Sequence, residues 1–265
     1  MGEEAGAMRK RDLLIRRLDQ IAGSLAAHGG ALALLGLGSA GLDLERMDEF
    51  SDLDFFVIVR PGSKAEFLDD LGWLAAGAPI AYAYRNTPDG HKALFPDGVF
   101  CEFAVFESDE LKAIPFAPGR LIWKAPGFDE SACTPPARLE HGQADTAWLV
   151  GEALTNLYVG LSRLCRGEKL AAERAIQVRA VDAVLRLAAQ VETERPVARD
   201  PFAEERRFES RYPRLAVELP SFVQGLERSR ESALAILGFL ERSFPVNAAI
   251  AAEVRALAKE PSKAR

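Results

Sequence analysis

The stretch GLGSAGLDLERMDEFSDLDFFVIV, residues 36–59, decides how the first half of the chain folds. It holds a glycine-rich turn, a polar connection, and two aspartates, Asp52 and Asp54, at the start of an apolar run. Because successive side chains on a strand point to opposite faces, these two aspartates project the same way. Two neighbouring carboxylates repel each other unless a cation lies between them, which predicts a divalent metal site for an ion such as Mg²⁺.

Apolar runs and helical periodicities surround this stretch. Residues 31–35 predict a buried strand before the turn, and residues 53–59 predict a strand covered on both faces. Apolar residues recur at helical spacing over residues 14–25, which predicts an amphipathic helix ahead of the first strand. Ser63 and Glu66 have the spacing of a capping box, so we expect another helix after the second strand.

Residues 80–106 change to an alternating pattern, which predicts three antiparallel strands joined by two hairpins. Glu102 is the only charged residue in the segment 99–106. A carboxylate among apolar strand neighbours needs a partner or a metal ion. Glu102 therefore joins Asp52 and Asp54 as a candidate site residue.

The C-terminal half of the sequence has a different character. Residues 126–136, PGFDESACTPP, have the composition of a turn and linker, and helical periodicity dominates after them. We therefore predict an α+β protein, with a mixed five-stranded sheet and helices in residues 1–135 and an all-α helical bundle in residues 136–265.

Composition excludes several classes of function. The formal net charge of -6 argues against a general nucleic-acid binder. The three cysteines are scattered, with no histidines at ligand spacing, so zinc sites and disulfides are not expected. No segment has the uninterrupted apolar length of a membrane span, so we expect a cytoplasmic protein without membrane partners.

The turn GLGSAG also fits the dinucleotide-binding pattern G-x-G-x-x-G. A Rossmann unit needs a crossover helix after the glycines and an acid near the end of the second strand, whereas here the link 42–51 is short and the acids open the strand. No Gly-Lys-Ser/Thr follows, so the turn is not a Walker A loop. The alternatives without function are an ordinary tight turn and acids exposed at a sheet edge.

The order of an apolar strand, Gly38-Ser39, Asp52-Leu53-Asp54 and a later strand-borne Glu102 resembles the nucleotidyltransferase superfamily that includes DNA polymerase β. The run FSDLDF, residues 50–55, is similar to that of the antibiotic nucleotidyltransferases, especially the lincosamide group, which also have a helical C-terminal domain. The resemblance implies transfer of a nucleoside monophosphate, AMP from ATP, to a hydroxyl of a small acceptor, with release of pyrophosphate. A lincosamide or aminoglycoside-like antibiotic is the implied acceptor, and antibiotic resistance the implied role.

By this resemblance, Gly38 and Ser39 bind the β- and γ-phosphates of a nucleoside triphosphate, and Asp52 and Asp54 hold Mg²⁺. Glycine lets backbone N–H groups approach phosphate oxygens, and the metal neutralises the triphosphate charge. Glu102 would either complete a two-metal site or take the proton of the acceptor hydroxyl, and both roles stay open.

Three further expectations concern partners. Arg46, together with Lys169 or Arg174, is a candidate contact for the triphosphate. Related antibiotic-modifying enzymes are often dimers, so a homodimer is expected, and a protein side chain or an RNA end is an alternative acceptor. The alternative from another class is a catalytically inactive nucleotide-binding module that serves as a sensor or scaffold.

Overall fold

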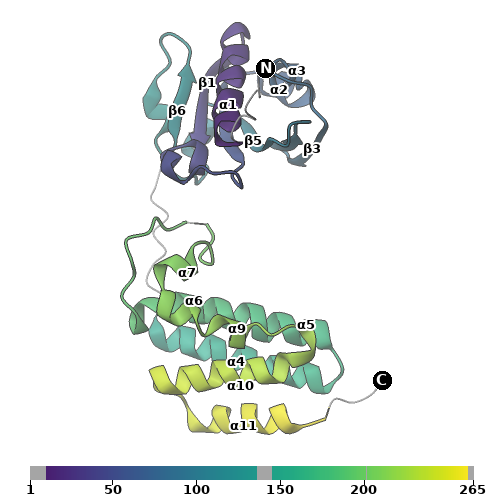
Figure 1. Cartoon of the computed structure of the whole chain (residues 1–265), viewed down its shortest axis with the longest axis vertical. Coiled ribbons are helices and arrows are strands. Elements are labelled where there is room, and N and C mark those ends of the chain that lie inside the picture. The colour runs from purple at the N-terminus through teal and green to yellow at the C-terminus, as the bar shows by residue number, and fades with distance from the viewer. Residues whose placement is uncertain (1–9, 136–144, 201, 262–265) are drawn as a thin grey trace, which may run out of the picture. The chain divides into compact units, whose positions relative to one another are not determined.

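The computed structural model describes residues 10–135, 145–200 and 202–261. The chain divides into two compact units, Met1–Leu139 and Glu140–Arg265 (Figure 1). The predicted change of domain after residue 135 lies at the edge of a segment outside the described residues. The α+β class is confirmed, because the first unit holds a mixed sheet with helices and the described part of the second unit is helical.

One six-stranded sheet, in the order β3-β4-β5-β2-β1-β6, forms the centre of the first unit. Its strands are β1 (Ala31–Leu37), β2 (Leu53–Val59), β3 (Tyr82–Thr87), β4 (Gly90–Leu94), β5 (Phe100–Glu107) and β6 (Arg120–Lys124). The strands β2 and β5 pair in parallel, and all other neighbours pair antiparallel. Since β1 and β2 are antiparallel, the unit is not a Rossmann unit, whose successive strands run parallel.

The sixth strand, β6, corrects our prediction of five. Its sequence RLIWK has only three apolar residues between two charges, too few to display a strand period. Its strand conformation comes instead from antiparallel pairing with β1. The three antiparallel strands predicted over residues 80–106 are confirmed as β3, β4 and β5.

Helices cover one face of this sheet. The predicted first helix is confirmed as α1 (Lys10–Ala27), and it lies against the sheet in Figure 1. Two short helices, α2 (Lys64–Asp69) and α3 (Gly72–Ala75), complete the cover. The large core of the unit lies between these helices and the sheet. The prediction of a helix after the second strand is confirmed by α2, but the predicted capping box is wrong. Ser63 precedes α2, yet its side chain makes no cap hydrogen bond. The carboxylate of Glu66 instead lies 3.6 Å from the Nε2 atom of His28.

The other face of the sheet carries a smaller core. It includes Ile58 and Phe106, near the C-terminal ends of β2 and β5, and Leu111 of the 3-10 turn η3 (Glu110–Lys112). At the opposite ends of the same strands, this face carries polar side chains. The remaining short turns of the unit are η1 (Gly38–Ala40), η2 (Leu44–Arg46) and η4 (Glu130–Cys133).

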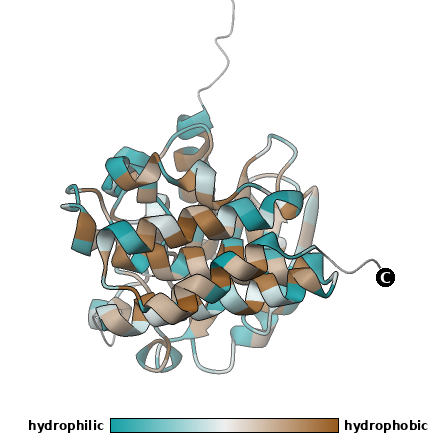
Figure 2. Ribbon diagram, turned by 90° about the horizontal axis from the view of Figure 1, so that it is seen from below, coloured by the Kyte–Doolittle hydropathy of each residue, from teal (hydrophilic) through white to brown (hydrophobic). Residues whose placement is uncertain are grey.

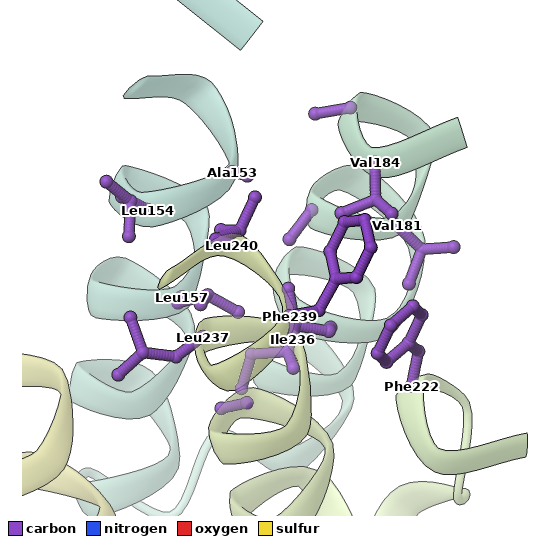
Figure 3. Packing of buried hydrophobic residues seen from close by; sticks show 14 of the residues in the cluster. Ala153, Leu154, Leu157, Val181, Val184, Phe222, Ile236, Leu237, Phe239 and Leu240 are labelled. Carbon is purple, nitrogen blue, oxygen red and sulfur yellow. The ribbon is translucent and has the colours of Figure 1, made fainter. Parts of the chain in front are cut away.

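The second unit is built around long helices. Its elements are α4 (Thr146–Cys165), α5 (Lys169–Glu173), the π-helix η5 (Arg174–Ala180), α6 (Val181–Val191), α7 (Phe208–Arg211), α8 (Pro213–Ala216), α9 (Leu219–Phe222), η6 (Leu226–Arg228), α10 (Ser229–Ser243) and α11 (Ala248–Lys259). Hydrophobic and hydrophilic residues alternate around these helices (Figure 2). Figure 3 shows the resulting core, in which Phe222 and Phe239 meet with ring centroids 5.6 Å apart. No helix in the described part of the chain has the length and apolarity needed to cross a membrane.

A buried glutamine fixes a chain reversal in the second unit. Gln177 lies in the π-helix, and its side-chain amide donates to the carbonyl of Gly225 at 2.8 Å and to the hydroxyl of Ser229 at 3.0 Å. Its carbonyl oxygen accepts from the backbone N–H groups of Gln224 and Gly225, both at 2.8 Å. The segment before α10 is therefore attached to the π-helix through one side chain.

A buried arginine anchors the irregular segment between α6 and α8. The Arg211 side chain is fully buried and donates to the carboxylates of Glu194 and Glu204, at 3.0 and 3.3 Å. Its guanidinium also lies over the rings of Phe208 and Tyr212. We call Arg211, Glu194 and Glu204 the buried cluster after its arginine; the side chains of Glu194 and Glu204 are 34% and 19% exposed.

Candidate active site in the first unit

The parallel register of β2 and β5 places two of the predicted acids next to each other. Asp54 pairs with Glu102, so both side chains leave the same face of the sheet on neighbouring strands, which lie about 4.8 Å apart. On the next strand, Lys92 is opposite Glu102, and on β3 Tyr84 is opposite Lys92. We call Asp54, Glu102, Lys92 and Tyr84 the polar row. It lies on the sheet face away from α1.

The glycine turn lies at one end of the polar row. Gly38 begins η1 directly after β1 and has a φ of +51°, a left-handed conformation that glycine adopts without strain. A Cβ atom on Gly38 would lie 3.5 Å from the Oδ2 atom of Asp54. The hydroxyl of Ser39 donates to the carbonyl of Asp52 at 3.5 Å. The fold thus brings the turn and both aspartates together.

Close backbone packing holds this turn in place. A Cβ atom on Gly36 would lie 2.5 Å from the carbonyl oxygen of Ala40, so a larger residue does not fit there. The guanidinium of Arg120, on β6, donates to the carbonyls of Ala40 and Gly41, each at 3.3 Å. Sequence reasoning missed Arg120 because it missed its strand. The turn is therefore shaped by the neighbouring strand as well as by its own glycines.

Glu102 has polar partners on both carboxylate oxygens. The side-chain amide of Asn86 donates to Oε1 at 2.9 Å, and the Lys92 ammonium lies 3.0 Å from Oε2. The hydrogen bond and charge of Glu102 raise the pKa of Lys92, so the ammonium stays protonated at neutral pH. Among the described residues, no three His, Cys, Asp or Glu side chains are grouped so that they could hold a metal ion together.

The donor set of the two aspartates suits a hard cation. Asp54 offers carboxylate oxygens beside the turn, and Asp52 directly precedes β2 with its backbone carbonyl at Ser39; oxygen ligands are those that Mg²⁺ prefers. The third acid is near, but Lys92 and Asn86 hold it. With its present partners Glu102 neighbours the aspartates without completing a metal site.

Two of the three predicted basic contacts have other partners, and the third, Arg174, begins the π-helix η5. Arg46 lies in η2 and forms an ion pair with Asp43 at 3.0 Å. Lys169 lies in the second unit, where its ammonium is 2.7 Å from a carboxylate oxygen of Glu227. Their roles toward a triphosphate stay predictions.

The residues on β3 and β4 carried a weak signal in the sequence. Lys92 follows an Asp-Gly turn and could be placed near a cleft, but Asn86 gave no signal of its own. Lys92 is opposite Glu102 through the register of β4 and β5, and Asn86 lies at an irregularity of the β3–β4 pairing, between Arg85 and Thr87. Tyr84 and Tyr82 add an exposed aromatic pair on β3, with ring centroids 5.8 Å apart.

Comparison with known proteins gives structural likenesses only. No protein family and no curated protein matches the chain. Among solved structures, it is similar to an aminoglycoside 6-adenyltransferase from Bacillus subtilis, with 13% identity, a TM-score of 0.35, and coverage of 94% of this chain and 92% of that one. It is also similar to a STING-associated CdnE c-di-GMP synthase from Capnocytophaga granulosa, with 11% identity, a TM-score of 0.31, and coverage of 95% and 79%.

Proposed function

We propose that this protein is a Mg²⁺-dependent nucleotidyltransferase that moves AMP from ATP to a hydroxyl of a small acceptor. The observation that carries the proposal is the convergence of Gly38-Ser39, Asp52 and Asp54 at one end of a sheet face, with Glu102 in register beside Asp54. A lincosamide or an aminoglycoside-like antibiotic is the acceptor we would test first, because the FSDLDF run resembles that of enzymes modifying such compounds.

Each group has a role in this reaction. The η1 turn, with the hydroxyl of Ser39, would bind the triphosphate, because a glycine turn lets phosphate oxygens approach the backbone closely. Asp52 and Asp54 would hold Mg²⁺, which when bound neutralises charge on the phosphates and orients them for in-line displacement. Arg46 and Lys169 stay candidate phosphate contacts.

The acceptor would bind on the side of Glu102 that faces β4 and β3. Its hydroxyl oxygen would form a bond to the α-phosphorus of ATP while the bond from that phosphorus to the bridging oxygen breaks, and pyrophosphate leaves. The hydroxyl proton would pass to Glu102 or to water. Tyr84 and Tyr82, exposed beyond Lys92 on the same face, would contact the acceptor.

A second candidate function has a specific observation in its favour. Both oxygens of Glu102 are engaged by Asn86 and Lys92, which is also what a nucleotide-binding module without chemistry would display. Such a module would act as a sensor or scaffold, binding ATP through the turn and the aspartates.

One experiment separates the two functions. Thermal unfolding of the full chain is measured with ATP, with Mg²⁺ and with both, and pyrophosphate release is then measured across a panel of lincosamides, aminoglycosides and other hydroxyl compounds. A transferase is stabilised by ATP with Mg²⁺ and releases pyrophosphate with at least one acceptor, whose mass rises by one nucleoside monophosphate. Stabilisation without turnover for every acceptor supports the module, and absence of any stabilisation contradicts both.

Sedimentation at micromolar concentration, with and without ATP, tests the expected homodimer separately. A monomer under both conditions contradicts that expectation and leaves the assignment of the polar row unchanged.

A further inference from the structure

Lys92 occupies a position that the proposed reaction does not explain. It lies directly opposite Glu102 on the antiparallel pair of β4 and β5, and its ammonium is 3.0 Å from Oε2 of that carboxylate. On the other side of Glu102, in register on the parallel strand, is Asp54. The ammonium therefore belongs to a row in which two neighbouring acids come first and one cation follows.

This ammonium compensates the charge of both acids. Two carboxylates on neighbouring strands repel each other, and a cation beside them lowers that repulsion. The pKa of Lys92 is raised chiefly by its hydrogen bond with Glu102, and the negative charge of Asp54 also contributes. The side chains of Lys92 and Glu102 are 32% and 42% exposed, so water and ions reach the pair.

The partners of Glu102 weaken its capacity to bind a metal ion. Asn86 and Lys92 together engage both of its oxygens, and no group of three metal-binding side chains exists among the described residues. A carboxylate oxygen that accepts from an ammonium at 3.0 Å offers less negative charge to a metal ion. An ammonium beside a divalent cation also repels it.

We infer that Lys92 competes with a divalent cation for Glu102, and that its ammonium must leave this carboxylate before Glu102 can join Asp52 and Asp54. This rests on the proposed function, because it takes the two aspartates as the Mg²⁺ ligands. The released ammonium, on a flexible four-carbon side chain, is then free to contact a phosphate oxygen. Lys92 is thus a positioning residue that sets how tightly the site takes a divalent cation.

The test measures cation binding rather than turnover. Mn²⁺ binding to the nucleotide-free full chain is followed by electron paramagnetic resonance, in the wild type and in Lys92→Met. Removing the competing charge should tighten Mn²⁺ binding by about five- to tenfold. Lys92→Arg keeps the charge and should bind Mn²⁺ as the wild type does. An unchanged affinity in Lys92→Met, with the fold intact by circular dichroism, overturns the inference.

A matched control comes from the same unit. Lys64 also bridges two carboxylates, with its ammonium 2.7 Å from Asp89 and 2.6 Å from Glu110, and neither acid belongs to the polar row. Lys64→Met should leave Mn²⁺ affinity unchanged. An equal rise in that variant means that net charge alone sets the affinity, which also overturns the inference.

Two further variants keep the test decisive. Lys92→Gln retains a hydrogen-bond donor toward Glu102, so it should show the same rise even if Lys92→Met does not fold. In a Glu102→Gln background, Lys92→Met should produce no rise, because the carboxylate that the two cations share is gone. A full rise in that background overturns the inference.

The inference and the proposed function fail differently. If ATP with Mg²⁺ neither stabilises the protein nor supports turnover, the proposed function fails. If the wild type binds ATP with Mg²⁺ but Lys92 variants bind Mn²⁺ as it does, only the inference fails.

Discussion

The polar row of the first unit and the buried cluster of the second are both assembled from acids and a base, yet they differ in their contact with water. In the buried cluster, the Arg211 side chain is fully buried and contacts two carboxylates and two aromatic rings. In the polar row, Lys92 and Glu102 are each about one-third or more exposed.

The difference indicates two physical tasks. A buried ion pair has lost its hydration, so removing one partner leaves an uncompensated charge and destabilises the fold strongly. An exposed pair contributes little to stability and exchanges its partners readily. We therefore assign the buried cluster to stability and the polar row to binding, and each prediction below tests one side of that assignment.

The largest expected effect is on activity. Asp54→Asn keeps the size of the side chain but removes the charge that would hold Mg²⁺, so we expect transfer to fall by at least about 10⁴-fold, the scale seen when an essential catalytic group is removed. The free energy of unfolding should change by less than about 1 kcal/mol, because the Asp54 side chain is only half-buried and the substitution keeps its size. Pyrophosphate release and urea denaturation measure the two quantities.

The control for this variant is Asp109→Asn. Asp109 is an exposed acid of the same unit that pairs with Lys112. Its loss should leave pyrophosphate release within about twofold of the wild type. Full activity of Asp54→Asn would show that the polar row does not bind the metal.

The next effect is on stability. Arg211→Met should lower the free energy of unfolding by about 3–5 kcal/mol, because Glu194 and Glu204 lose their buried partner. Urea denaturation of the full chain, followed by the helical signal, measures it. Arg228→Met is the matched control, since Arg228 pairs with Glu231 and both side chains are exposed, at 60% and 49%, and it should cost less than about 1 kcal/mol. Equal losses in the two arginine variants would contradict the assignment of the buried cluster to stability.

A smaller effect concerns the shape of the turn. Gly36→Ala places a Cβ atom 2.5 Å from the carbonyl of Ala40, and overpacking of this kind costs about 1–3 kcal/mol. The turn should shift, so the stabilisation of the protein by ATP with Mg²⁺ should weaken. The control is Gly29→Ala, where a Cβ atom meets nothing within 4 Å. If ATP with Mg²⁺ stabilises Gly36→Ala as much as the wild type, the turn does not bind the nucleotide.

The smallest effect concerns the acceptor. If Tyr84 contacts it through its exposed ring, Tyr84→Ala should raise the KM for the acceptor by about two- to tenfold and leave the KM for ATP unchanged, since one aromatic contact contributes about 0.5–1.5 kcal/mol. Steady-state kinetics with each substrate varied in turn measures both constants. Tyr158→Ala, an exposed tyrosine of α4, is the control. A rise in the KM for ATP instead would place the nucleotide on β3.

The sequence allowed the first helix, five strands and the class of the fold to be predicted, because each has enough residues to display a period. β6 could not be predicted, because its five residues become a strand only by pairing with β1. The contacts of Glu102 with Asn86 and Lys92 could not be predicted either. Alternation tells which side chains share a face of one strand, but the register between strands depends on the length of the hairpin connection and on packing.

The candidate site shows the same division. The Gly38-Ser39 turn and the spacing of Asp52 and Asp54 are local patterns, so they could be found in the chain. Arg120 supports the turn from a strand far along the sequence. Such long-range contacts leave no local signal, because any surface arginine looks the same in a sequence.

The parallel pairing of β2 with β5 has a consequence for biogenesis. Asp54 and Glu102 become neighbours only when everything between them, including α2, α3 and the hairpin of β3 and β4, has been synthesised and folded back. Such non-local pairings form slowly. A nascent chain that ends before β5 therefore carries both aspartates and the glycine turn but no Glu102 beside them, so the polar row is complete only after β5 has been synthesised and paired.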